Sequence, residues 1–286
     1  MAAGEVTIGV VGLGLMGGSV AVKLRKEGFL NRAVGCDINP DHGKRAVELG
    51  IVDDVVDIKR LSSESDIIVL AIPVDKAIKI LPDIMKNVTE STVVLDLGST
   101  KEKIAQAADK LPNRGQFVAC HPIAGTENSG PDAAFDSLFD GKVNIICDKE
   151  KTSEIALEKT IKLFEILGMR NKFMDSKSHD RHIAYVSHLS HVSSFVLGQT
   201  VLEVEKDEAS IFDMAGSGFD STVRLAKSSP TMWAPIFTEN ADNLLLVLDR
   251  YIKNLNEFRT LIEERNDKEL NQAMTEINVI RKVLKG

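Results

Sequence analysis

The residue with the clearest capacity for chemistry is His121, which opens the motif H-P-I-A-G at residues 121–125. It directly follows an apolar run at 117–120 that predicts a buried strand, and it lies downstream of a glycine-rich loop. Open α/β sheets bind their ligands in the crevice at the carboxyl ends of the strands. A histidine in that crevice can act as a base at neutral pH. The placement therefore predicts a dehydrogenase in which His121 takes up the proton.

The glycine-rich loop reads G-L-G-L-M-G from Gly12 to Gly17 and follows a β-branched run at residues 7–11. Gly12 permits a tight turn, Gly14 lets the backbone approach a pyrophosphate, and Gly17 lets the following helix pack closely on the strand. That helix would present its N-terminal amides to the phosphates. The plainer alternative is a glycine-rich helix start that binds no ligand.

An acidic residue follows the second predicted strand, where a dinucleotide-binding domain needs one. This strand, at residues 33–36, ends in Asp37, about twenty residues beyond the last glycine of the loop. A carboxylate there would accept hydrogen bonds from the adenosine ribose and repel a 2′-phosphate, so NAD is favoured over NADP. The residues expected at the cofactor are Gly12, Gly14, Leu15, Met16, Gly17, Asp37, Ile72, Pro73 and Ser99.

Further apolar runs that predict strands lie at residues 66–73, 93–99 and 144–147. They alternate with segments of helical length, which predicts βα units, right-handed crossovers and a mostly parallel, doubly wound sheet. We assign residues 1–175 to this α/β Rossmann domain. Ser99 follows one of the strands, so it would share an edge of the sheet with His121. It could also simply cap the helix expected at about 101–110.

The second part of the chain has long stretches of helical period in place of the strand-like runs. Residues 179–203 predict a helix buried on most sides, and Ser229 followed by Pro230 is typical of a helix start. An apolar stripe over 236–262 predicts one long amphipathic helix. A last helix would carry Leu270, Met274, Ile277 and Val283. We assign residues 176–286 to an all-α helical domain and expect its surplus apolar surface to form a homodimer.

Composition and charge argue against several classes of protein. The 286 residues carry a net charge of −7 and no basic stripe, so a nucleic-acid footprint is not expected. The three cysteines lie apart within apolar runs, which is typical of reduced thiols rather than a disulfide framework or a metal site. The uncharged stretch at 6–22 follows Glu5 and holds the glycine loop, so it predicts neither a signal peptide nor a membrane span. We expect a cytoplasmic enzyme.

Five motifs, in order along the chain, point to one family. They are the glycine loop, D-L-G-S-T-K at 96–101, H-P-I-A-G-T-E at 121–127, V-S-H-L-S-H at 186–191, and G-S-G-F with R-L-A-K-S-S-P at 216–230. Together they resemble the prephenate and arogenate dehydrogenases of tyrosine biosynthesis over nearly the whole length. The resemblance implies a Rossmann domain, a helical dimerisation domain and NAD-dependent oxidative decarboxylation of prephenate to 4-hydroxyphenylpyruvate. It also implies the monofunctional form, with neither a chorismate mutase segment nor a regulatory domain.

The resemblance implies a role for each site residue. His121, as a neutral imidazole with a pKa near its ordinary value, accepts the C4 hydroxyl proton while hydride leaves C4. Ser99 hydrogen-bonds that hydroxyl or the imidazole. Arg224 grips a substrate carboxylate through two parallel hydrogen bonds, unless it is only a solvated charge. The other residues of the substrate pocket are His191, Thr126 and Glu127.

Two neighbouring histidines make a metal site an alternative to consider. His188 and His191 are three residues apart and would face nearly the same way on a helix. His179 and His182 would face the opposite side and leave no third ligand. We therefore predict no metal site, with His188 as a structural partner.

Asp220 departs from the family pattern, in which a basic residue follows the aromatic residue of the glycine-rich motif. An acidic residue would repel a carboxylate of prephenate or accept from the amino group of arogenate, unless it points to solvent or pairs with Arg224. Arogenate dehydrogenase is thus one alternative. A β-hydroxyacid dehydrogenase would need a lysine that residues 179–197 lack, and a non-catalytic NAD-binding scaffold would leave Ser99 and His121 unexplained.

Overall fold

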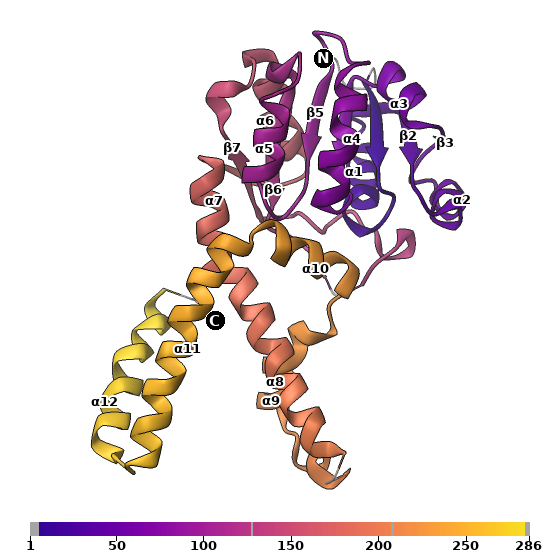
Figure 1. The fold of residues 1–286 in the computed structure, drawn as a ribbon. Coiled ribbons are helices and arrows are strands. Elements are labelled where there is room, and N and C mark those ends of the chain that lie inside the picture. The colour runs from indigo at the N-terminus through magenta and orange to yellow at the C-terminus, as the bar shows by residue number, and fades with distance from the viewer. Residues whose placement is uncertain (1–5, 127, 207–208, 284–286) are drawn as a thin grey trace. The chain divides into compact units, whose positions relative to one another are not determined.

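The computed structural model describes residues 6–126, 128–206 and 209–283, and it divides into two compact units, Met1–Asn240 and Ala241–Gly286 (Figure 1). The first unit contains one sheet with the helices that cover it, followed by further helices. The second unit is a pair of helices. In the described ranges, none of the helices combines the length and the apolar character needed to cross a membrane.

The sheet has eight strands and is doubly wound. Its strands are β1 Val6–Val11, β2 Leu30–Cys36, β3 Asp54–Val55, β4 Ile67–Leu70, β5 Val93–Asp96, β6 Phe117–Pro122, β7 Val143–Cys147 and β8 Arg170–Met174. They lie in the order β3-β2-β1-β4-β5-β6-β7-β8, and only the pair β6 and β7 is antiparallel. Because the chain moves outward from β1 first to one side and then to the other, the predicted Rossmann topology is confirmed.

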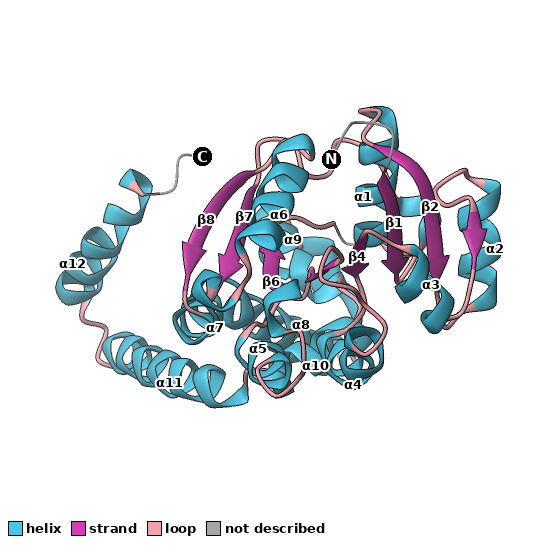
Figure 2. Ribbon diagram, turned by 90° about the horizontal axis from the view of Figure 1, so that it is seen from above, coloured by secondary structure: helices cyan, strands magenta, loops and turns pink. Residues whose placement is uncertain are grey.

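Helices cover both faces of the sheet (Figure 2). They are α1 Leu15–Lys26, α2 Pro40–Glu48, α3 Ile58–Glu64, α4 Val74–Met85, α5 Glu102–Ala108 and α6 Glu154–Ile166. Successive strand residues point to opposite faces, so each apolar strand contributes to two cores. Val69 and Leu95 pack in the core that includes α1 and α6, whereas Ile68 and Val94 pack in the core with α4 and α5. Burial on both faces explains why these strands are continuous apolar runs.

The far edge of the sheet differs from the expected parallel series. β7 was expected to continue that series, but it pairs with β6 in the antiparallel sense, with Cys120 opposite Ile146. In its described residues, the connection from β6 to β7 holds only a short 3-10 turn, Pro131–Ala133, and a parallel neighbour would require a long crossover. β8 was not predicted, because this edge strand begins with the polar residues Arg170, Asn171 and Lys172.

The helices that follow the sheet form where the sequence predicts helices, but they are more exposed than expected. α7 Ser176–Ile183, a π-helical turn Ala184–His188 and α8 Leu189–Glu205 form a nearly continuous helix. The prediction of burial on most sides is wrong for α8 in the single chain, where Ser194 is its one buried residue. The reason is that little besides α9 Ser217–Val223 and the 3-10 turns beside it packs on α8. α10 Pro230–Glu239 starts after Ser229, as predicted.

The long helix predicted over 236–262 is interrupted. α10 ends at Glu239, and α11 Ala241–Glu263 begins only after Asn240, which has the non-helical dihedrals φ −110° and ψ 28°. The Asn240 side chain is buried and donates to the carbonyl oxygen of Asp180 at 2.7 Å. The apolar spacing continues across this break, so the period could not reveal it. α12 Asp267–Ile277 is the predicted last helix, but it ends before Val283.

Candidate active site

The predicted site residues lie along one edge of the sheet. Gly12 follows β1, Asp37 follows β2, Pro73 follows β4, Ser99 follows β5, and His121 is near the end of β6. These five strands are adjacent and parallel, so their carboxyl ends meet at the same edge. Fold topology therefore brings together side chains that are far apart in the sequence.

The glycine loop has the geometry of a dinucleotide site. Gly12 has φ +94° and donates its N–H to the Cys36 carbonyl at 2.8 Å, which closes the turn against β2. A Cβ on Gly17 would lie 2.1 Å from the Gly12 oxygen, so only glycine allows this approach of helix and loop. Asp37 accepts from the backbone N–H of Leu13 at 2.7 Å, which joins the carboxylate to the loop. These residues fit the adenosine and pyrophosphate parts of NAD.

His121 is the first member of a buried hydrogen-bonded series. Its Nδ1 lies 2.8 Å from Nε2 of His179, and Nδ1 of His179 lies 2.7 Å from Oδ1 of Asp180. The Asp180 carboxylate also accepts from the backbone N–H groups of Lys101 at 2.7 Å and Glu102 at 2.9 Å. His179, which the helix-face argument considered only as a metal ligand, thus faces His121. The alternative in which Ser99 caps α5 is wrong, because Asp180 satisfies the N-terminus of that helix.

The hydrogen-bond partners define the tautomer of each ring. Asp180 meets His179 as an acceptor, so His179 carries its hydrogen on Nδ1 and has a lone pair on Nε2. His121 must then donate from Nδ1 to His179. This arrangement leaves Nε2 of His121 unprotonated in the neutral ring. The series therefore orients His121 as a base.

The electrostatics keep His121 neutral. Burial lowers the pKa of His121 well below its usual range, and the positive charge of Lys101 acts in the same direction. The expectation of a pKa near the ordinary value is therefore wrong, because only 8% of the residue is exposed. Neutral His121 is the state that accepts a proton.

A buried ion pair joins the ends of β5 and β6 behind His121. The Lys101 ammonium donates to the Asp96 carboxylate and, at 2.8 Å, to the carbonyl oxygen of Cys120. Both charged side chains are almost wholly buried. The interaction holds the residue before His121 against the strand that leads to Ser99. Sequence reasoning missed Lys101, His179 and Asp180 as site residues, although a lysine in D-L-G-S-T-K and the adjacent His-Asp pair were visible signals.

The helical side of the site holds the predicted substrate residues. The His191 ring stacks on Trp233, with centroids 3.4 Å apart and planes 24° apart. Burial lowers the pKa of His191, the hydrogen bond to the Ser187 carbonyl opposes this shift, and the positive charge of Arg224 adds to the lowering. Ser194 on α8 donates to the Thr222 carbonyl and accepts from the Ala226 amide. These two hydrogen bonds hold the turn that carries Arg224 against α8.

Arg224 and Asp220, both near this turn, differ in whether they form an ion pair. Arg224 is exposed and forms no ion pair with any residue that the structure describes. Asp220 pairs with Lys227 at 2.8 Å and therefore not with Arg224. His188 and His191 make separate contacts, since His188 meets Asn240 at 3.2 Å whereas His191 stacks on Trp233.

The remaining predicted residues lie at the sheet edge or in the loop after β6, and none of those described hydrogen-bonds to His121. Ser99 is half-buried and makes no hydrogen bond to His121 within the described ranges, where His179 occupies Nδ1 instead. Thr126 is exposed and accepts from the Asn128 amide at 3.2 Å. Glu127 lies outside the described residues. Ile72 is half-buried, and the neighbouring Pro73 is exposed at the sheet edge.

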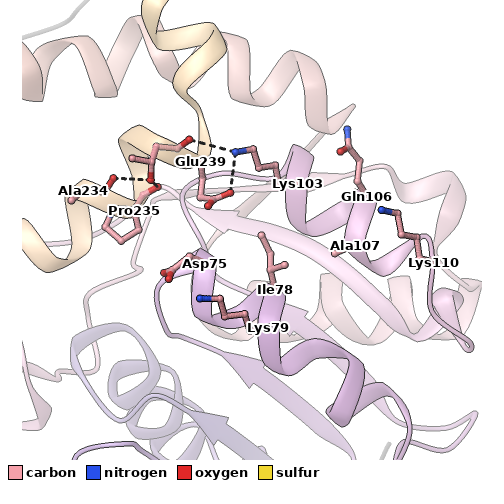
Figure 3. A pocket seen from close by; sticks show the side chains of 11 residues that line it. Asp75, Ile78, Lys79, Lys103, Gln106, Ala107, Lys110, Ala234, Pro235 and Glu239 are labelled. Atoms are coloured by element: carbon pink, nitrogen blue, oxygen red, sulfur yellow. Dashed lines mark hydrogen bonds and ion pairs between the residues drawn. The ribbon is translucent and has the colours of Figure 1, made fainter.

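A separate groove of about 640 Å³ runs between α4, α5 and α10 (Figure 3). Lys79, Lys103 and Lys110 line it together with Asp75 and Glu239, and Lys103 pairs with Glu239 at 3.2 Å. None of the predicted site residues lines the groove. The candidate active site is therefore the strand edge, because the base and the glycine loop lie there.

Comparison with known proteins agrees with this geometry. The family model for the nucleotide-binding domain of prephenate dehydrogenase matches residues 20–172, and the model for its dimerization domain matches residues 175–276. The chain belongs to the prephenate dehydrogenase family. It is 32% identical to prephenate dehydrogenase of Bacillus subtilis, over 92% of this chain and 72% of that protein. It is also 32% identical to cyclohexadienyl dehydrogenase of Zymomonas mobilis, over 97% and 96% of the two chains.

Solved structures of family members show the same fold. The structure of Aquifex aeolicus prephenate dehydrogenase in complex with hydroxyphenyl propionate and NAD⁺ has a TM-score of 0.91 and 33% identity, over 99% of both chains. Synechocystis arogenate dehydrogenase has a TM-score of 0.77 and 29% identity, over 96% of this chain and 99% of that one. The family thus includes enzymes named for either substrate.

Proposed function

We infer that this chain is an NAD-dependent prephenate dehydrogenase, which converts prephenate to 4-hydroxyphenylpyruvate and carbon dioxide in tyrosine biosynthesis. The observation that carries this conclusion is the oriented base: His121, held by His179 and Asp180 beside a dinucleotide loop. The similarity to the Aquifex aeolicus enzyme, whose structure holds NAD⁺ and hydroxyphenyl propionate, supports both the cofactor and the substrate class.

The residues of this chain supply proton transfer and orientation. Nε2 of His121 accepts the proton of the C4 hydroxyl, and His179 with Asp180 stabilises the imidazolium that forms. Bound NAD would take the hydride from C4. The ring carboxylate then leaves as carbon dioxide, its bonding electrons enter the ring, and His121 returns the proton to the oxygen as the ring becomes aromatic. Aromatisation drives this step, so the protein mainly has to orient the substrate.

Recognition of the substrate is assigned to the helical side. Arg224 would bind one carboxylate of prephenate through two parallel hydrogen bonds, since it has no ion-pair partner among the described residues. His191 would line the pocket, with its ring fixed by the stack on Trp233. Ser99 would contact the C4 hydroxyl, and Thr126 and Glu127 would shape the pocket mouth. Lys227 neutralises Asp220, which favours prephenate over arogenate.

The helical domain would also join two copies of the chain. We assign residues 1–175 to the nucleotide-binding domain and residues 176–286 to the helical domain, which would form a homodimer. Exposed apolar side chains on its helices support this role, and they include Leu202, Leu246, Ile252, Leu255 and Ile262. The free thiols of Cys36, Cys120 and Cys147 agree with a cytoplasmic enzyme.

An assay with both substrates tests the function. NADH absorbance is followed after prephenate or arogenate is added to the full chain with NAD, and the product is identified. We expect 4-hydroxyphenylpyruvate from prephenate, with a higher kcat/KM than for arogenate. Faster turnover of arogenate would make the chain an arogenate dehydrogenase, and no NADH from either substrate would overturn the proposal.

A further inference from the structure

The segment 130–136, here named the strap, lies along the start of α1. A Cβ on Gly14 would be 3.8 Å from the backbone nitrogen of Gly130, and a Cβ on Gly18 would be 2.7 Å from Cβ of Ala134. The Phe135 N–H donates to the Ser19 hydroxyl at 3.0 Å. The strap therefore runs beside the first turn of α1 in the same direction. It comes from the chain that continues beyond His121 and β6, not from the glycine loop itself.

Two ion pairs attach the strap to the helices that flank the cofactor site. Arg45 on α2 donates from Nε at 2.9 Å and from Nη2 at 2.7 Å to Oδ1 of Asp132. Lys26 at the end of α1 pairs with Asp136. α1 carries the predicted pyrophosphate site at its N-terminus, and α2 follows the ribose carboxylate Asp37. These contacts fix the strap relative to both parts of the dinucleotide site.

The backbone of Gly130 has features of a ligand contact. Its φ of +85° is a conformation that strains residues with a Cβ. Its N–H donates no hydrogen bond within the described ranges. That nitrogen lies 3.8 Å from the Cβ position on Gly14, which is ordinary contact distance, so the Gly130 amide borders the start of α1. A pyrophosphate bound at the N-terminus of α1 would meet this free donor from the side opposite the helix.

We propose that the strap is a second wall of the pyrophosphate site, and that the Gly130 amide donates a hydrogen bond to the pyrophosphate of NAD. The proposal rests on the assignment of the cofactor and adds a residue outside the glycine loop. The loop that follows the catalytic base would thereby also hold the cofactor.

Amide NMR of the full chain tests the contact directly. ADP-ribose, which contains the pyrophosphate, is compared with adenosine, which lacks it. We expect ADP-ribose to move the Gly130 amide proton strongly downfield, whereas adenosine leaves it nearly in place but shifts the signals around Asp37. An unchanged Gly130 signal with ADP-ribose would overturn the proposal. Binding of neither ligand would instead contradict the cofactor assignment.

Substitution of the glycine gives a second test. Gly130→Ala should raise the Kd for NAD and ADP-ribose about tenfold, because a displaced amide loses a charge-assisted hydrogen bond. The Kd for adenosine should change less than about twofold. The matched control is Gly141→Ala, since Gly141 also has positive φ, +71°, with nothing within 4 Å of its Cβ position. Equal weakening by both variants, or equal weakening of adenosine, would contradict a specific contact.

A charge exchange tests the anchor. Arg45→Asp and Asp132→Arg should each raise the Kd for ADP-ribose by about two- to fivefold, the range of an exposed ion pair, and the double variant should recover most of the affinity. The control is Arg60→Ala, which breaks the exposed ion pair with Glu64 elsewhere on the surface. Additive losses in the double variant, or a parallel loss of adenosine binding, would show that Arg45 acts on the nucleotide without the strap.

Discussion

The two sides of the candidate active site are built in opposite ways. On the sheet side, His121, His179 and Lys101 are buried, and each side chain has a hydrogen-bond partner. On the helical side, Arg224 and Asp220 are exposed, and α8 buries only Ser194. Burial strengthens electrostatic interactions and fixes geometry, whereas an exposed side chain keeps its freedom to adapt. The comparison assigns the chemical step to the sheet side and substrate choice to the helical side.

Replacing the base His121 on the sheet side should cause the largest loss of activity. His121→Asn removes the group that accepts the C4 hydroxyl proton, so kcat should fall by roughly a hundredfold or more while the Kd for NAD stays near its original value. In the unsubstituted enzyme, kcat should decline only below pH 6.5, since the pKa of His121 is lowered. This decline should vanish in the variant. Near-normal turnover of His121→Asn, measured by NADH formation, would mean that another group takes the proton.

The second histidine tests whether orientation matters. His179→Phe removes the acceptor that keeps the hydrogen of His121 on Nδ1, so kcat should fall roughly tenfold to a hundredfold with little change in KM. The acidic decline in kcat should also move. His182→Phe, a substitution of an exposed histidine on the same helix, should leave kcat unchanged. If both variants keep full turnover while melting normally, His179 is only a structural residue.

Arg224 tests the helical side. Truncating a charge that binds a carboxylate costs about 2 to 5 kcal/mol, so Arg224→Gln should raise KM for prephenate at least tenfold with little effect on NAD binding. Arg224→Lys should rescue only part of the loss, because a point charge cannot form two parallel hydrogen bonds. Arg60→Gln on α3 is the control. An unchanged KM would place the carboxylate contact elsewhere and weaken the division between the two sides.

Asp37 tests the cofactor part of the sheet edge. NAD should have a much higher kcat/KM than NADP, and Asp37→Ala should narrow that ratio about tenfold by removing the repulsion of a 2′-phosphate. Asp37 also accepts from the amides of Leu13 and Asn39, so the variant should lose some NAD affinity as well. Equal use of the two cofactors by the unsubstituted enzyme would contradict this role.

The smallest effect concerns stability. Burial lowers the pKa of His188 to about 4, below the value of about 6.5 for an unfolded chain. Between these pH values the unfolded state binds more protons, so the free energy of unfolding should fall as pH falls, by about 1 to 3 kcal/mol. Urea unfolding at several pH values measures the slope. His188→Gln should reduce the slope of the free energy of unfolding against pH, whereas His182→Gln should not. An equal slope in both variants would mean that His188 does not cause the pH dependence.

Local signals sufficed for much of the sheet and its edge. Apolar runs long enough for buried strands predicted β1, β4, β5 and β6, because a strand buried on both faces has no polar alternation. The glycine loop and Asp37 could be placed because dinucleotide binding demands particular backbone geometry at fixed spacing. β8 gave no such signal, since an edge strand with polar residues resembles a loop in sequence.

Only the tertiary structure decided the partners of these elements. His179 meets His121 across 58 residues of sequence, and a rule based on helix faces could not reveal this partner because it considered one helix alone. The direction of β7 depended on a connection without a crossover helix, and the break at Asn240 depended on a buried hydrogen bond to Asp180. The sequence by itself therefore determined which residues could do chemistry and which elements would form. Long-range packing determined the orientation of the base, because hydrogen bonds between distant residues leave no period or motif in the chain.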